Sequence, residues 1–380
     1  MSGTGYILAG RFVDGSGAEV RRNILMEIKD GIIIALQPVP VLPNDTAVDD
    51  LSHCTVVPAL LDCNVSLLQS PSVNGGKAPS DESEDEVAEQ EIMLERHIGY
   101  CFAHGILSLV ANDKDKHELL QKYRRKCGRS SGIDIRIAHS AVNADFLRIM
   151  YSSDIEEEGE RSFGLNHENL CRILRTRGEK KAIVVANGTQ QVTEALEAGC
   201  DAIEQGYGMG EANLRRMEEK DVLWIPSVVR AKNALDASSG GGSVCCRFST
   251  RYIAPGEPVP GAEAFWKKIL AEQLDQLCLA RELGVKTAVG TGAGSIGILH
   301  GESVVDEIKL FIKAGYSLEE SIQCASKNSA EFFGMQHGQL AVGQRATFLL
   351  TRGTAGQLPR KLSYLEGIYI DGVPSPDYRK

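Results

Sequence analysis

The sequence predicts an α/β chain made of a distorted (β/α)8 TIM-like barrel and a small β-sandwich domain formed by both termini. Two observations support this prediction: β-rich segments lie at both ends, and between them apolar strand-like runs alternate with helical patterns. Strands that alternate with helices form mostly parallel sheets, and eight such runs favour a closed barrel. We expect residues 1–57 and 338–380 to form the β domain and residues 58–337 to form the barrel.

The terminal segments are expected to be β because short apolar runs are separated by turn signals. Lys29-Asp30-Gly31 and Asp371-Gly372 are typical of hairpin turns, in which Asp and Gly tolerate positive φ. The predicted strands of this domain are Tyr6–Leu8, Ile24–Lys29, Ile32–Leu36, Gly338–Leu340, Thr347–Leu350 and Gly367–Val373.

The middle of the chain carries the predicted barrel strands. The acidic stretch Ser80–Glu91 is expected to open an exposed helix, because acids favour the N-terminal end of the helix dipole. Ala237–Ser243 is expected to be a flexible loop placed to act as a lid. The eight predicted strands are Leu60–Val65, Ile106–Val110, Asp134–Ala138, Phe146–Met150, Ala182–Ala186, Ala202–Gln205, Leu223–Pro226 and Lys286–Gly290.

Composition argues against several function classes. The net charge of −10 and pI near 5.4 argue against binding to nucleic acid or to an anionic membrane. No apolar run is long enough to span a bilayer, and the first residues do not resemble a signal peptide. The ten cysteines lack C-x-x-C spacing, as expected for reduced thiols. We therefore expect a cytoplasmic protein.

The stretch Val56–Leu68, VVPALLDCNVSLL, places polar residues at every second position. Asp62, Asn64 and Ser66 would share one face of an extended strand, because side chains alternate with period two. This pattern is typical of a barrel strand whose carboxyl end opens into a site.

The same stretch resembles the first barrel strand of the amidohydrolase superfamily, V-x-P-G-x-x-D-x-H-x-H, and the resemblance continues along nearly the whole chain. The imidazolonepropionase and Xaa-Pro dipeptidase branch is the most similar. In that family the two histidines of the motif bind the catalytic metal, and further strands supply a lysine, two histidines and a catalytic aspartate. The corresponding positions here are Asn64, Ser66, Arg148, Val185, Gln205 and Gly292.

These replacements predict that the metal site of the family is lost. Zinc, the metal that the resemblance implies, needs thiolate, imidazole or carboxylate ligands, and none of the six positions supplies one. We therefore expect no cofactor and no metal. Losing the aspartate also removes the proton acceptor for metal-bound water.

Two hypotheses are open for Arg148. Its guanidinium could bind an anionic ligand, or it could form an internal ion pair with Asp62. His300 lies where relatives keep a histidine on the substrate side, so it could bind a ligand, as could Asp62, or it could be a packed loop residue. A Ser66–His300–Asp62 triad is a remaining alternative. Gly292-Ala-Gly294-Ser-Ile-Gly297 matches G-x-G-x-x-G, but the next helix is expected only near Glu302, so we do not interpret the match as a dinucleotide site.

The preferred hypothesis is a degenerate amidohydrolase-like protein that binds a small ligand, or regulates a partner, without catalysis. The alternative is a hydrolase of carbon–nitrogen bonds with a metal-free or rebuilt site. Expected partners are a small anionic molecule, a second copy of the chain or an active homolog.

Overall fold

The computed structural model describes residues 4–38, 47–72, 84–113, 117–127, 132–140, 144–152, 165–238 and 261–378. The acidic run Asp154–Glu160 and most of the predicted lid, from residue 239 on, lie outside these residues. No helix within the described ranges combines the length and apolar character that crossing a membrane requires.

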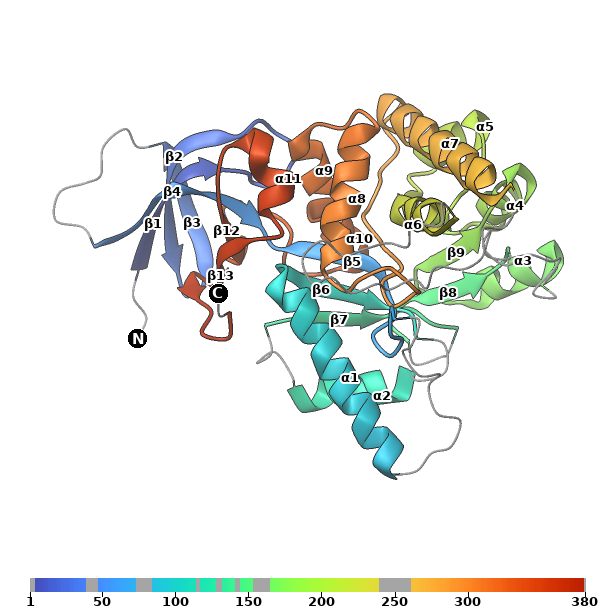
Figure 1. Cartoon of the computed structure of the whole chain (residues 1–380), viewed down its shortest axis with the longest axis horizontal. Coiled ribbons are helices and arrows are strands. Elements are labelled where there is room, and N and C mark those ends of the chain that lie inside the picture. The colour runs from blue at the N-terminus through green and yellow to red at the C-terminus, as the bar shows by residue number, and fades with distance from the viewer. Residues whose placement is uncertain are drawn as a thin grey trace.

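Both ends of the chain contribute to one seven-stranded sheet with the order β14-β13-β12-β4-β1-β2-β3. Figure 1 shows the blue strands of the N-terminal segment beside the red strands of the C-terminal segment. The strands are β1 (Thr4–Phe12), β2 (Arg21–Lys29), β3 (Ile32–Pro38), β4 (Val48–Pro58), β12 (Phe348–Arg352), β13 (Leu365–Ile370) and β14 (Val373–Pro374).

The terminal sheet curls around its own apolar core. Ile33 in the edge strand β3 donates to the carbonyl of Gln344 and accepts from Gly343, so the edge meets the segment that leads into β12. Fully buried Phe348 and Met26 belong to the core inside the curl. The terminal β domain is therefore confirmed, as one curled sheet rather than two packed sheets.

The turn signals of this domain are confirmed, but one predicted strand is wrong. Asp30 and Gly31 both have positive φ in the β2–β3 turn, and Asp371 and Gly372 do so before β14. Residues 338–340 form no strand, because Gly338 adopts a φ of 127° and closely approaches the backbone of Ser326.

The barrel strands form two parallel sheets, with orders β5-β6-β7 and β11-β10-β9-β8. Isolated parallel bridges such as Ala138 to Phe146 connect them, so the described strands form a distorted TIM-like barrel but no continuous closed sheet. The strands are β5 (Leu60–Val65), β6 (Ile106–Ala111), β7 (Asp134–Ile137), β8 (Leu147–Met150), β9 (Ala182–Ala186), β10 (Ala202–Gln205) and β11 (Leu223–Ile225).

The eighth predicted strand, Lys286–Gly290, forms no regular strand. Its place is nevertheless kept: Ala288 donates to the carbonyl of Trp224 in β11, and Cys63 in β5 donates to the carbonyl of Val289. The glycines that follow at positions 292 and 294 have positive φ, which ends extended structure. The segment therefore closes the ring by single hydrogen bonds.

Helices cover the barrel strands, and an apolar layer fills the space between them. Local signals fix several helix ends: Ser317 and Glu320 form a capping box at the start of α9, and Gly199 ends α4 in the left-handed conformation. The helices are α1 (Glu84–Ala103), α2 (His117–Cys127), α3 (His167–Thr176), α4 (Thr189–Ala198), α5 (Glu211–Glu219), α6 (Val228–Ser238), α7 (Ala262–Leu283), α8 (Glu302–Lys313), α9 (Leu318–Cys324), α10 (Lys327–Phe333) and α11 (Leu358–Lys361).

Candidate functional site

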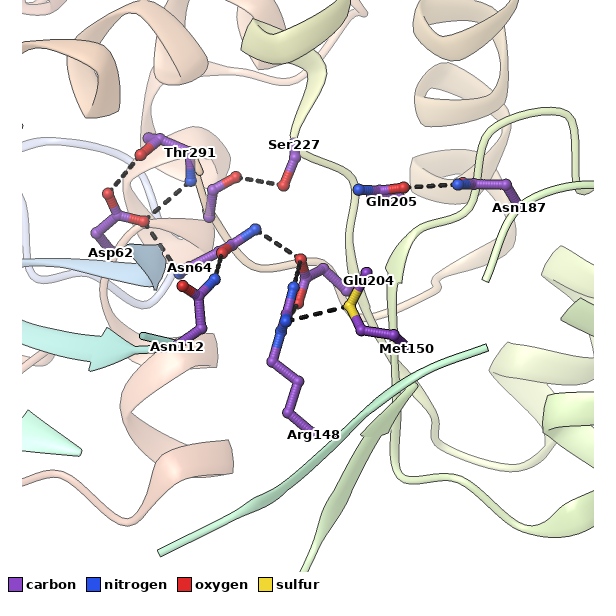
Figure 2. Close-up of polar contacts among 11 residues, drawn as sticks. Asp62, Asn64, Asn112, Arg148, Met150, Asn187, Glu204, Gln205, Ser227 and Thr291 are labelled. Atoms are coloured by element: carbon purple, nitrogen blue, oxygen red, sulfur yellow. Dashed lines mark hydrogen bonds and ion pairs between the residues drawn. The ribbon is translucent and has the colours of Figure 1, made fainter. Parts of the chain in front are cut away.

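Four polar side chains converge at the carboxyl ends of the barrel strands. Asn64 comes from β5, Asn112 directly follows β6, Arg148 lies in β8 and Glu204 lies in β10 (Figure 2). Parallel strands all end at the same side of a barrel, so residues from distant parts of the sequence meet there. We call these four residues the polar network.

The centre of the polar network is a two-point ion pair between Arg148 and Glu204. Arg148 Nε donates to Glu204 Oε2 at 2.7 Å, and Arg148 Nη2 donates to Glu204 Oε1 at 2.7 Å. The side chains are 10% and 2% exposed, respectively. Asn64 Nδ2 also donates to Glu204 Oε1, at 2.7 Å, and Asn112 Nδ2 donates to Asn64 Oδ1. Every member is therefore held by another.

Asp62 lies outside this network, so the ion pair with Arg148 hypothesised from the sequence is not formed. The Asp62 carboxylate accepts hydrogen bonds from the backbone N–H of Thr291 at 2.9 Å, the Thr291 hydroxyl at 2.6 Å and the N–H of Asn64 at 3.1 Å. Burial raises the pKa of Asp62 to about 6. Asp62 in β5 thus joins this strand to Thr291, which follows the segment at the eighth strand position.

Ser66 is buried at the end of the polar face and donates its hydroxyl hydrogen bond to Asp113 at 2.5 Å. Asp113 also accepts from the backbone N–H groups of Leu67 and Leu68. Burial raises the pKa of the Asp113 carboxyl. Ser66 and Asp113 together shape the turn that follows β5.

His300 does not approach the Ser66 hydroxyl. Its Nε2 lies 2.8 Å from the Ser66 carbonyl oxygen, its Nδ1 is buried without a hydrogen-bond partner, and its ring stacks on that of His97 at 3.8 Å. Burial, with a smaller effect of His97, lowers the pKa of His300 to about 3. A ring nitrogen that faces a carbonyl oxygen must carry the proton. The neutral His300 ring therefore donates a hydrogen bond from Nε2 to the backbone of Ser66. The Ser66–His300–Asp62 triad is not assembled.

Gln205 and Val185 do not line the space around Arg148. Gln205 adopts a φ of 71°, and its side-chain oxygen accepts from Asn187 at 2.6 Å; Figure 2 shows this pair apart from the polar network. Val185 is fully buried in β9 directly beside Glu204. Glu204, the residue before Gln205, therefore supplies the carboxylate of the network.

Gly292 leaves room for a second arginine. A Cβ atom at this position would lie 3.1 Å from Arg230 Cδ, and the φ of Gly292 is 72°. Arg230, in the first turn of α6, is 8% exposed. A larger residue at position 292 would require both backbone strain and displacement of Arg230.

The polar network borders a cavity of about 130 Å³. Of the six positions predicted from the sequence, four contribute to its wall, and Val185 and Gln205 do not. Asp62 and His300 do not line it either. The lining residues are Asn64, Ser66, Gln69, Asn112, Arg148, Met150, Arg230, Gly292, Ala293 and Ser295.

The residues at these positions do not fit a metal ion. Within the described ranges, no group of three or more His, Cys, Asp or Glu is placed to hold one. Of the polar network, only Glu204 has a ligand of the kind that zinc prefers, and both its oxygens already accept hydrogen bonds. The adjacent guanidinium would repel a cation.

Sequence reasoning missed Glu204, Asn112, Asp113 and Arg230. A glutamate inside the apolar strand AIEQ was a usable signal, because a charge buried in a parallel strand requires a partner. Asn112 and Asp113 directly follow the predicted strand Ile106–Val110, where polar residues reach the carboxyl end.

The sequence of residues 169–369, more than half of the chain, matches the model of the amidohydrolase family. This chain belongs to the amidohydrolase family. A 139-residue stretch is also 26% identical to an uncharacterized protein of Mycobacterium tuberculosis strain H37Rv, covering 37% of this chain and 33% of that protein. The match thus spans about a third of the length of the curated relatives.

Solved structures of similar fold cover nearly the whole amidohydrolase-family chain. A Xaa-Pro dipeptidase with bound methionine has a TM-score of 0.79 at 19% identity, covering 98% of this chain and 100% of that chain. A. niger ochratoxinase has a TM-score of 0.75 at 15% identity, with coverages of 98% and 95%. Molinate hydrolase has a TM-score of 0.72 at 14% identity, with coverages of 99% and 95%. These similarities establish the fold.

Proposed function

We propose that this chain is a non-catalytic member of the amidohydrolase family that binds a small polar molecule without a metal. The observation that carries the proposal is the Arg148–Glu204 ion pair at the carboxyl ends of the barrel strands. A permanent cation, Arg148, stands where the resemblance places a lysine, and the carboxylate that it engages comes from the residue before Gln205.

The electrostatics of the network support this proposal. A guanidinium has hydrogen-bond donors and no acceptor, so Arg148 cannot coordinate a metal. Removing Glu204 from Arg148 to serve as a ligand would leave the guanidinium buried without its partner, which is strongly unfavourable.

The polar cavity supports a binding role. Its wall carries amides, hydroxyls and guanidinium groups, and such convergent polar groups fix the orientation of a small ligand. The structurally similar dipeptidase holds a methionine in its active site, so this fold can bind a small molecule.

The alternative of a metal-free hydrolase has less support. The Ser66 hydroxyl donates to Asp113, whose oxygens also accept from two backbone N–H groups, and His300 is turned to a backbone carbonyl. An activated nucleophile needs a base that can take its proton and transfer it onward. Neither group is arranged to do so.

The proposal is tested by metal analysis and turnover assays on the purified protein. We expect substoichiometric zinc, iron and manganese, a melting temperature unchanged by chelator, and no hydrolysis of dipeptides, N-acyl amino acids or cyclic amides above background. An active dipeptidase assayed in parallel is the positive control. About one tightly bound zinc ion per chain, whose removal lowers the melting temperature, would contradict the proposal.

A further inference from the structure

The Arg148 guanidinium offers two edges for hydrogen bonding, and only one of them is taken by Glu204. Nε and Nη2 donate to the two Glu204 oxygens, whereas Nη1 contacts the Met150 sulfur at 3.3 Å. A thioether is a weak acceptor. Arg148 and Met150 both line the cavity, so the Nη1–Nη2 edge is the part of the guanidinium that a ligand can satisfy.

Other donors line the same cavity. Arg230 contributes a second guanidinium, and the amide of Asn112 and the hydroxyl of Ser295 are neutral donors in the wall. Guanidinium groups pair with carboxylates through two parallel N–H···O bonds, which makes an oxyanion a better match than a cation or an apolar molecule.

The cavity sets the size of the ligand. Its volume is about 130 Å³. A dipeptide is much larger than this space, whereas acetate has four non-hydrogen atoms. A very small anion therefore matches the size of this cavity better than a dipeptide does.

We propose that the cavity binds a small carboxylate whose two oxygens accept from the Nη1–Nη2 edge of Arg148, beside Arg230. This inference deepens the proposed binding function and rests on it. Glu204 then acts as a positioning residue, because it holds the guanidinium so that its second edge faces the cavity. Inorganic phosphate shares the oxyanion chemistry but adds volume and charge.

The test compares sodium acetate, sodium phosphate and sodium chloride at equal ionic strength, by thermal shift and isothermal titration calorimetry. Acetate should raise the melting temperature of the wild type saturably, and chloride should not. Stabilisation by phosphate without stabilisation by acetate would disprove the proposal that the ligand is a carboxylate. Equal effects of acetate and chloride would disprove the proposal that the cavity binds an oxyanion.

Two variants locate the binding. Met150→Glu leaves the Arg148–Glu204 pair intact and places an internal carboxylate beside the second edge, so the acetate Kd should weaken at least about tenfold. The double variant Arg148→Met/Glu204→Leu removes both charges together and should also lose the acetate effect. Arg215→Gln, which changes an exposed arginine of α5, is the matched control and should bind acetate as the wild type does. Unchanged acetate binding by Met150→Glu or by a folded double variant would overturn the proposal.

Failure of this inference is distinguishable from failure of the proposed function. A metal-free, inactive protein that responds equally to acetate and chloride disproves the carboxylate site alone. A metal-containing, active protein that still binds acetate through Arg148 disproves the non-catalytic function alone.

Discussion

Two arginine–carboxylate pairs in this protein have the same chemistry and different surroundings. Arg148 and Glu204 pair through two hydrogen bonds inside the barrel, with side-chain exposures of 10% and 2%. Arg345 and Asp371 also pair through two hydrogen bonds, between the segments flanking β12 and β13, with exposures of 33% and 32%. Burial, rather than geometry, separates the two pairs. A buried pair cannot lose one partner without leaving a charge in the interior, whereas water can replace either partner of an exposed pair.

The largest effect is expected from Arg148→Met. This change leaves Glu204 buried without its cation and should lower the free energy of unfolding by about 3–5 kcal/mol. Arg148→Met/Glu204→Leu removes both charges and should recover most of that loss. Urea unfolding of the wild type and both variants measures the difference. If the single and double variants were equally stable, the ion pair would not determine the stability of the barrel.

A second buried carboxyl group extends the comparison to pH. Glu307 in α8 is fully buried and accepts hydrogen bonds from the N–H groups of Val228 and Val229 at 2.8 and 2.6 Å. Burial raises the pKa of Glu307 to about 8, and the nearby Asp62 contributes to the increase.

The sign of the pH effect follows from proton binding. The folded protein keeps the Glu307 proton up to about pH 8, whereas the unfolded chain releases it near pH 4.5. The folded state binds more protons in this window, so stability should fall as pH rises through it. Glu307→Gln should flatten this slope between pH 6 and 8, above the pKa of about 6 of Asp62. Denaturant unfolding at several pH values measures the slope, and Glu211→Gln, which changes an exposed glutamate of α5, is the control. An unchanged slope in Glu307→Gln would show that Glu307 does not cause the fall of stability with pH.

The smallest effect is expected from Arg345→Met. Because both side chains of that pair are about one-third exposed, solvent screens the interaction, and the loss should be at most about 1 kcal/mol. The same urea experiment measures it beside Arg148→Met. A loss as large as that of Arg148→Met would show that burial does not distinguish the two pairs.

The sequence predicted much of the fold because local patterns determine it. The predicted ranges Leu60–Val65, Ala182–Ala186 and Ala202–Gln205 coincide with β5, β9 and β10, since each begins with apolar residues and is bounded by breaks in the pattern. The family motifs brought Asn64, Ser66, Arg148 and Gly292 to one cavity.

The partners within the site were harder to predict because they depend on backbone irregularities. The register between β5 and β6 shifts twice, and Gln205 leaves the extended conformation with a φ of 71°. Strand alternation alone therefore does not determine which of two neighbouring residues faces Arg148. Packing in three dimensions determines that Arg148 pairs with Glu204 and not with Gln205 or Asp62.

The terminal sheet has a consequence for synthesis of the chain. Pro58 at the end of β4 pairs with Phe348 of β12, so one side of β4 has no strand partner until the chain has grown through the whole barrel. At about 5–20 residues per second, that interval lasts roughly 15–60 s on the ribosome. An unpaired strand edge attracts other extended chains during this time. The β domain begins with β1, and its sheet is complete only when β12, β13 and β14 have been synthesised.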